Sequence, residues 1–294
     1  MTPVAVFAFN RPQVLKKTLE ALAACPEAAD TDLYLFVDGP RGEKDAEKVA
    51  DTRSVGMAVT GFRSFTPVFS ERNKGLAASI IGGVTQVLAK HETVIVLEDD
   101  LLVMPSFLSF MNLGLQKYQD RPEVFSVCGY SNRFTPPKDY PFNTYFCARS
   151  SSWGWATWRD RWEKVDWNPS EEAIRRERWG FNRWGGSDCT RMLMGWKTGK
   201  NNSWAIRFCF AQYLSGAVSL FPVKSLVDNS AGFDGAGTNC HKYSRFKFEL
   251  DEGKDRAFGF PPDTRPDPRI SRRALWYHSL PLRFHSLVMY HLYG

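Results

Sequence analysis

Residues 94–105 read VIVLEDDLLVMP, in which an apolar run ends in three consecutive acids. A short, continuous apolar run is typical of a strand that is buried on both faces of a parallel sheet. Ligands of open α/β sheets bind outside the carboxyl ends of the strands. The position of Glu98, Asp99 and Asp100 therefore predicts a ligand site at one edge of a sheet.

The segments around this strand alternate between strand-like and helix-like patterns, which predicts an α/β fold with a mixed, mostly parallel sheet flanked by helices. We expect Asn10 to cap the first helix and the Gly82-Gly83 pair to permit close packing. The expected strands cover residues 4–9, 33–37, 65–69, 93–97 and 124–128, and the expected helices cover 12–22, 43–57, 76–89 and 105–119.

The character of the chain changes after about Tyr130, where Trp, Phe, Arg and Gly crowd together. We interpret this part as an aromatic-rich excursion over the active edge of the sheet, with a helix over 203–214, a strand over 217–223 and a Gly-rich loop over 231–241. No internal repeat is present. We expect one domain over 1–260, in two halves that meet at 129/130, and a basic and aromatic tail over 261–294.

Composition excludes several classes of protein. Of the 294 residues, 43% are hydrophobic and 24% are charged, which excludes disorder, collagen and coiled coil. The net charge of +6 suits an anionic small ligand or a membrane surface. No long Lys/Arg run or zinc-finger spacing is present, so we expect no nucleic-acid partner. The six cysteines form no CxxC pair, and no signal peptide or membrane-spanning run is visible, so we expect reduced thiols and a cytoplasmic protein.

The three acids have two interpretations. Adjacent carboxylates repel one another, and a cation such as Mn²⁺ or Mg²⁺, held by one or two of them and by substrate phosphates, would offset that repulsion. Alternatively, the acids face the positive end of a helix dipole ahead of Pro105. We weigh the two equally from the triplet alone.

Other polar residues are expected at the same edge, each with a plainer alternative. Asp38 follows the second strand and could accept hydrogen bonds from a nucleotide, although an Asp-Gly-Pro turn explains it as well. Arg11 follows the first strand and could pair with a phosphate or a base, or be an ordinary surface arginine. Residues 72–76, RNKGL, precede a helix and could meet an anionic ligand, or simply form the turn that starts it.

Together these segments resemble GT-A glycosyltransferases, in particular bacterial family 2-like enzymes and the N-acetylglucosaminyltransferase I group. The resemblance rests on FNRP (9–12), FVDGP (36–40), ERNKGLAAS (71–79), VLEDD (96–100) and WGWATW (153–158), and it covers most of the chain to about His241. It implies a nucleotide-sugar donor, most plausibly UDP-linked, a divalent metal, and a glycan or lipid-linked acceptor. It also implies inversion at the anomeric carbon and a place in surface polysaccharide synthesis.

The resemblance implies a role for each residue at the edge. Asp100 would coordinate the metal, Asp99 would meet the ribose or a metal-bound water, and Glu98 would meet the donor sugar. Arg11 and Asp38 would hold the base, while Asn73 and Lys74 would line the ribose and phosphate side.

The catalytic base does not follow the family pattern. Similar enzymes tend to carry an acid just before a segment like SWAIR (203–207), but this chain has Asn202 there. Asp188 is our leading candidate and Asp234 the second. An N-cap of the following helix is an equally good interpretation of Asp188.

Two tryptophans and one histidine complete the candidate set. Trp153 and Trp155 are expected to stack on sugar rings, whereas Trp158 and Trp162 are expected in the core. His241 follows the Gly-rich loop and could supply a late metal ligand, or be an exposed loop histidine.

The expected function is a metal-dependent glycosyltransferase. Arginines beside aromatic residues in the tail suit peripheral contact with the inner face of a membrane, and docking on the protein's own core is the alternative. A noncatalytic nucleotide-sugar or glycan-binding protein is the rival function, supported by Asn202. A sugar-phosphate nucleotidyltransferase is a weaker rival, because FNRP is not its expected Gly-rich signature.

Overall fold

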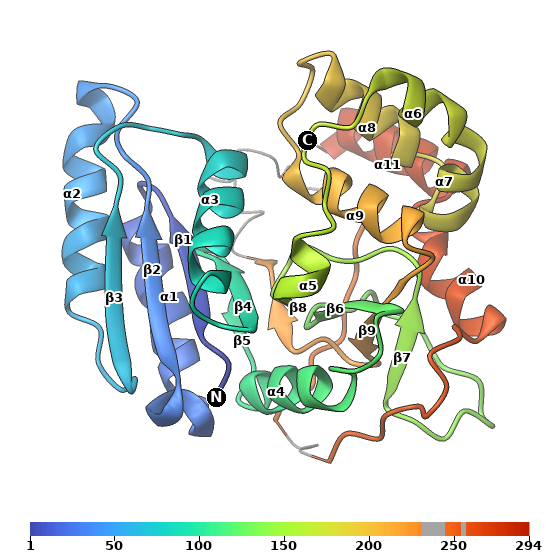
Figure 1. Cartoon of the computed structure of the whole chain (residues 1–294), viewed down its shortest axis with the longest axis horizontal. Helices are drawn as coiled ribbons and strands as arrows, with labels where there is room; N and C mark the ends of the chain where they lie inside the picture. The colour runs from blue at the N-terminus through green and yellow to red at the C-terminus, as the bar shows by residue number, and fades with distance from the viewer. Residues whose placement is uncertain (231–244, 254–256, 294) are drawn as a thin grey trace.

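An eight-stranded sheet forms the centre of the computed structural model, which describes residues 1–230, 245–253 and 257–293 (Figure 1). Its strand order is β3-β2-β1-β4-β8-β6-β9-β7, and a two-stranded ribbon, β10-β5, lies beside it. The strands are β1 (Val4–Ala8), β2 (Asp32–Val37), β3 (Ser64–Phe69), β4 (Thr93–Glu98), β5 (Leu102–Val103), β6 (Val124–Cys128), β7 (Thr144–Cys147), β8 (Trp155–Trp158), β9 (Val218–Pro222) and β10 (Val227–Asp228).

Helices cover both faces of the sheet. Buried side chains of α1, α2 and α4 share one hydrophobic cluster, and those of α3, α9 and α10 share the cluster on the other face. The helices are α1 (Pro12–Ala23), α2 (Glu43–Met57), α3 (Leu76–Leu88), α4 (Phe107–Lys117), α5 (Arg159–Trp162), α6 (Glu171–Arg176), α7 (Arg178–Gly185), α8 (Cys189–Lys197), α9 (Trp204–Leu214), α10 (Pro268–Trp276) and α11 (Leu280–Tyr293), with a 3₁₀ turn, η1 (Pro26–Asp30).

The sheet is mixed but mostly parallel, which confirms the predicted α/β class. β3, β2, β1 and β4 pair in parallel, β8 pairs antiparallel with both β4 and β6, and β6 pairs in parallel with β9. The carboxyl ends of the first four strands therefore meet at one edge. The apolar runs in β1 and β4 are buried on both faces, as a doubly covered sheet requires.

The predicted elements up to β6 all form, with small differences at their ends. Asn10 does not cap α1, because its side-chain amide donates to Asp45 Oδ1 at 2.8 Å and Arg11 occupies the N-cap position. α4 begins at Phe107 rather than Pro105, after a turn closed by the Phe107 amide and the Met104 carbonyl at 2.9 Å.

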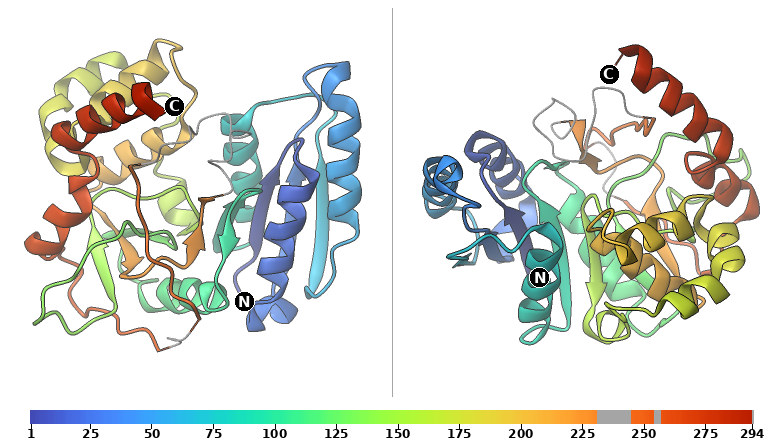
Figure 2. Two further views of the ribbon diagram at one scale, coloured as in Figure 1. Left: turned by 180° about the vertical axis from the view of Figure 1, so that it is seen from behind. Right: turned by 90° about the horizontal axis from the view of Figure 1, so that it is seen from above.

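Part of the C-terminal tail belongs to the core. α10 packs against β7 and buries Ile270 and Ala274 completely or nearly so. α11 follows at the periphery of the molecule, as the two views in Figure 2 show. The part of the chain that the structure describes has no helix that is both long and apolar enough to cross a membrane.

The two adjacent glycines of α3 differ in their surroundings. A Cβ at Gly83 would lie 2.6 Å from Cε1 of Phe7, whose ring stacks on that of Phe36 with 4.8 Å between centroids. A Cβ at Gly82 would meet nothing within 4 Å. Close packing of α3 on the sheet therefore depends on Gly83 alone.

We predict opposite effects for two otherwise identical substitutions. Gly83→Ala should lower the free energy of unfolding by about 1–3 kcal/mol, because the stacked rings must shift to admit the methyl group. Gly82→Ala should raise it by up to about 1 kcal/mol, because alanine favours the helix. Urea denaturation of both variants checks this, and equal effects would contradict the packing described.

Candidate nucleotide-binding edge

Four segments that are distant in sequence meet at the carboxyl edge of the parallel strands. Arg11 follows β1, Asp38 follows β2, residues 72–75 follow β3, and residues 98–100 end β4 and continue beyond it. The strand register places them together, since Phe7 pairs with both Phe36 and Glu98. The predicted convergence of these segments on one edge is therefore present.

Arg11 joins two of the three acids. Its Nη2 donates to Asp99 Oδ1 and, at 3.1 Å, to Asp100 Oδ2. The side chains differ in exposure: that of Asp99 is 5% exposed and that of Asp100 is 18% exposed. Burial lowers the pKa of Arg11, but the two carboxylates outweigh it and raise that pKa overall. Asp100 is thus the acid with an open side, while Asp99 is held inside.

Burial and mutual repulsion raise the pKa of two of the three acids. Burial, followed by the charges of Asp100 and Asp99, raises the pKa of Glu98 to about 8. Burial also raises the pKa of Asp99 to about 6, although Arg11 opposes it. A single arginine therefore does not fully compensate this group. A further cation at the edge would stabilise the charged forms.

Asp38 organises the loop that follows β3. Its carboxylate accepts hydrogen bonds from the backbone amides of Gly39, Lys74 and Gly75, each at 2.9 Å. The Asn73 side-chain amide donates to the Gly39 carbonyl at 2.9 Å. A Cβ at Gly39 would lie 2.5 Å from the backbone of Arg72, so the close approach of the two loops requires glycine. Asp38 is buried by these contacts, and it holds Asn73 and Lys74 in place.

The two candidate tryptophans lie in different environments. Trp155 is only 1% exposed, and its ring packs against Trp162 and Trp204 in the core. The expectation that Trp155 faces the substrate side is therefore wrong, because β8 is a central strand that buries both of its faces. Trp153 lies outside the strand, half-buried, with its ring 4.6 Å from that of Tyr130.

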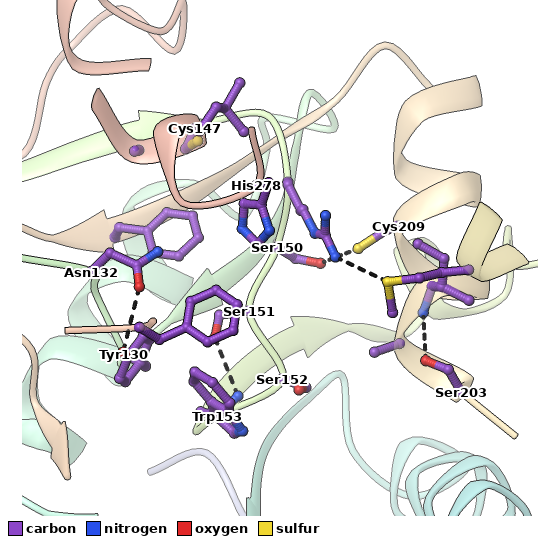
Figure 3. Close-up of a pocket in the computed structure, with 18 of the residues that line it drawn as sticks. Tyr130, Asn132, Cys147, Ser150, Ser151, Ser152, Trp153, Ser203, Cys209 and His278 are labelled. Carbon is purple, nitrogen blue, oxygen red and sulfur yellow. Dashed lines mark hydrogen bonds between the residues drawn. The ribbon is translucent and has the colours of Figure 1, made fainter. Parts of the chain in front are cut away.

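Trp153 lines a cavity of about 250 Å³ (Figure 3). It is also lined by Tyr130, which follows β6, Arg149, which follows β7, and His278, which precedes α11. Because β8 runs antiparallel to β4, with Trp155 opposite Val96, Trp153 lies toward the Glu98 end of β4. The cavity thus begins next to the acidic edge. Sequence reasoning missed Arg149 and His278, and the only available signal was the position of Arg149 just before the Trp153 motif.

Asp188 is paired with an arginine. Its Oδ1 accepts from Arg149 Nη1 at 2.7 Å, and the Asp188 side chain is only 4% exposed. Burial acts to raise the pKa of Asp188, but the charges of Arg149 and His278 outweigh it and lower that pKa. Asp188 also occupies the N-cap position of α8, although its side chain makes no capping hydrogen bond. The arrangement is that of a fixed counter-ion.

The carboxylates at the edge are the described side chains that could hold a divalent cation. Among the residues that the structure describes, no three His, Cys, Asp or Glu side chains are grouped to hold a metal. Asp100 has a partly exposed carboxylate beside Asp99, and one or two carboxylates with substrate phosphates suffice for Mg²⁺ or Mn²⁺. The donor set therefore fits a cation that the ligand helps to bind. His241 and Asp234 lie outside the described residues.

We predict a pH-dependent stability that comes from Glu98. The folded protein holds a proton on Glu98 up to about pH 8, whereas the ordinary pKa is 4.5, so the free energy of unfolding should fall as the pH rises between these values. Glu98→Gln is neutral at every pH and should remove part of this fall, on the order of 1–4 kcal/mol at pH 9.

Chemical denaturation at pH 5, 7 and 9 measures the effect, with Glu47→Gln on the exposed face of α2 as the control. Parallel pH profiles for wild type and Glu98→Gln would contradict the burial of that carboxyl.

Comparison with known proteins gives structural neighbours only. No family model and no curated protein sequence matches this chain. A mannosyltransferase from Pyrobaculum calidifontis, solved with GDP-Man and Mn²⁺, is 14% identical with a TM-score of 0.40, over 58% of this chain and 49% of that one. A UDP-glucose pyrophosphorylase, solved with UDP-glucose, is 13% identical with a TM-score of 0.42, over 79% and 94%. TarS of S. aureus is 11% identical with a TM-score of 0.36, over 76% and 35%.

This chain therefore spans about half of the mannosyltransferase and about a third of TarS. Glycosyltransferases and a pyrophosphorylase both occur among its neighbours. Because these similarities are distant, its function must be inferred from its own residues.

Proposed function

We propose that the chain is a metal-dependent GT-A glycosyltransferase that moves a sugar from a nucleoside diphosphate donor, most plausibly a UDP-sugar, to a glycan or lipid-linked acceptor. The observation that carries the proposal is the joint placement of Arg11, Asp99 and Asp100 beside the loop that Asp38 holds. Cationic, amide and carboxylate groups thus converge where a nucleotide and its metal would need them.

Each group at the edge has a physical role in this proposal. Asp100 presents the exposed carboxylate for Mn²⁺ or Mg²⁺, and His241 is the second proposed ligand. Arg11 fixes the orientation of Asp99 and Asp100 and stands beside the base. Asn73 and Lys74, positioned through Asp38, line the ribose and phosphates. The metal, when bound, offsets the negative charge that builds on the leaving diphosphate.

Glu98 and Trp153 are proposed to hold the two sugars. Glu98 ends β4 and would accept hydrogen bonds from hydroxyl groups of the donor sugar. Trp153 would stack on the acceptor, because its half-buried ring lines the cavity beside that strand end. The donor-side and acceptor-side groups are then neighbours, as transfer between two sugars requires.

The proton acceptor for an inverting transfer needs a carboxylate with a free side. The buried Asp188 carboxylate accepts from Arg149, so its geometry supports a structural role better than a catalytic one. Asp234 is accordingly the candidate base that we carry forward, on sequence grounds.

A noncatalytic nucleotide-sugar-binding protein is the second candidate function. Asn202 Nδ2 would lie 3.9 Å from a Cβ at Gly75, so this amide stands beside the loop that Asp38 holds. An amide cannot accept a proton near neutral pH. Tight binding of donor and acceptor with no transfer would favour this second function.

We predict that Asp100→Asn abolishes the metal-dependent part of nucleotide binding. Isothermal titration of UDP into the wild type with Mn²⁺ should give an affinity at least about tenfold higher than with EDTA, and the variant should lose that difference, because the exposed carboxylate is removed. Asp120→Asn, an exposed site beyond α4, is the matched control. An unchanged metal effect in Asp100→Asn would remove Asp100 from the proposal.

Peripheral membrane contact is proposed for α11. Phe284, Leu287 and Leu280 are 70%, 54% and 66% exposed, and these positions recur at helical spacing on one side. No Asp or Glu occurs from Pro268 to the end of the chain, whereas four arginines do. An exposed apolar face with basic neighbours fits an anionic lipid surface.

We predict that Phe284→Ser with Leu287→Ser lowers binding to vesicles of phosphatidylglycerol and phosphatidylcholine at least about fivefold, because buried apolar area is lost. Met57→Ser, an equally exposed apolar site on α2, should leave binding unchanged. Vesicle co-sedimentation measures this, and equal loss in both proteins would contradict a specific role of α11.

A further inference from the structure

Arginine side chains gather at and near the cavity that Trp153 lines. Arg149 and His278 line it directly, and His278 is labelled in Figure 3. Arg245 is not part of the lining, but its guanidinium lies 4.4 Å from the ring centroid of Phe246, which is. Burial lowers the pKa of Arg245, Asp188 opposes this, and the charges of Arg149, Arg283 and Arg191 lower it further. We call Arg149, Arg191, Arg245 and Arg283 the arginine cluster.

One carboxylate faces this cluster. Among the described groups whose charges act most strongly on Arg245 and His278, Asp188 is the only acid. Asp188 is committed to Arg149 at 2.7 Å. The arginine cluster therefore holds more positive charge than its described surroundings compensate. A folded protein maintains such an arrangement at a cost unless an anion offsets it.

Several donors of the cavity lack a strong acceptor. The described contact of Arg149 Nη2 is a thioether, Met192 Sδ at 3.6 Å, which is a weak acceptor. Arg245 donates from Nε to the Tyr277 carbonyl at 2.9 Å, and no hydrogen bond joins its two terminal nitrogens to a described residue. His278 Nδ1 is buried without a hydrogen-bond partner in the described part of the chain. These groups can donate to an oxyanion that enters the cavity.

The cluster is distinct from the acids that would hold the donor and its metal. The cavity is not lined by Glu98, Asp99 or Asp100. Trp153 does line it, and Trp153 lies toward the Glu98 end of β4. A molecule that stacks on Trp153 could thus place one end at the donor edge and the other end among the arginines. That second end must be anionic.

We propose that this cavity binds a phosphate or diphosphate group of the acceptor. Arg149 and His278, which line it, are the recognition residues, and Arg245 and Arg283 add positive charge beside them. Several arginines against one carboxylate match the multiple charge of a diphosphate better than the single charge of a sugar carboxylate. The inference rests on the proposed transferase function, and it names the class of acceptor: a phosphorylated sugar or a phosphate-linked lipid.

The test uses the full chain and inorganic pyrophosphate, in EDTA so that no metal site contributes. Isothermal titration at fixed ionic strength should show binding to the wild type, and the double variant Arg245→Gln with Arg283→Gln should bind at least tenfold more weakly. The control is the double variant Arg272→Gln with Arg176→Gln, which removes the same charge at exposed sites outside the cluster. This control should bind pyrophosphate as the wild type does. If the double variant fails to fold, Arg191→Gln, which is exposed, should still weaken binding severalfold.

Three outcomes overturn the proposal. The first is that the wild type does not bind pyrophosphate. The second is that the cluster variant and the control variant both bind it as the wild type does. The third is that both variants lose affinity equally, which would show a nonspecific effect of net charge. Mn²⁺-dependent UDP binding is measured in the same proteins. If it is intact while pyrophosphate binding is absent, only the phosphate site fails. If UDP binding is absent throughout while the cluster variants still lose pyrophosphate, the phosphate site stands and the transferase function fails.

A second arm identifies the source of the phosphate. Competition of pyrophosphate by glucose 1-phosphate indicates a soluble sugar phosphate. Stronger competition by dodecyl phosphate below its micelle concentration indicates a lipid-linked acceptor. Competition by glucuronate as strong as that by either phosphate would overturn the preference for phosphate over carboxylate.

Discussion

The ion pairs of Arg11 with Asp99 and Asp100 tie the carboxyl end of β1 to that of β4, and the chemistry of the whole edge depends on them. Burial, followed by the neighbouring carboxylates, raises the pKa of Glu98, which Arg11 does not contact, to about 8, whereas Arg11 opposes the rise in the pKa of Asp99. Arg11 pairs with the buried Asp99 and also with Asp100, whose side chain stays partly accessible to solvent. The sheet therefore presents a partly compensated negative site, which a cation and an anionic ligand can complete together.

A second constraint is the set of hydrogen bonds by which Asp38 holds the loop after β3 at the same edge as these acids. Asp38 satisfies three backbone amides, two of them in the loop after β3, and Gly39 allows that loop to approach within contact distance. Asp38 thus acts by positioning Asn73 and Lys74. Beyond β8 the charge changes sign, because Arg149 lines the neighbouring cavity and the other arginines of the cluster lie near it. In our proposal, the acidic edge binds a nucleotide and its metal, and the neighbouring cavity binds a phosphate-bearing acceptor.

The sequence predicts the strands and the edge well because these are local signals. The apolar runs that end in Arg11, Asp38 and Glu98 determine both the strands and the side on which their polar residues emerge. Burial within the second half could be predicted only in part: Trp158 and Trp162, expected in the core, are 2% and 4% exposed. Trp153 and Trp155 look alike in sequence, but only Trp155 falls within a central strand. The Arg149–Asp188 pair links residues 39 positions apart, so it leaves no local pattern. α10 joins the core through Ile270 and Ala274, which are one helical turn apart, but this spacing does not say which surface they pack against.

The most direct test of the account is a thermal-unfolding panel of the wild-type chain with UDP, GDP, dTDP and CMP, each with Mn²⁺, with Mg²⁺ and with EDTA. Ligands that bind the folded state raise the melting temperature. The account predicts that one nucleoside diphosphate, with UDP expected, stabilises the protein only when a divalent cation is present. No stabilisation by any nucleotide, or stabilisation that is the same in EDTA, would contradict the joint nucleotide and metal site at the edge of β1 and β4.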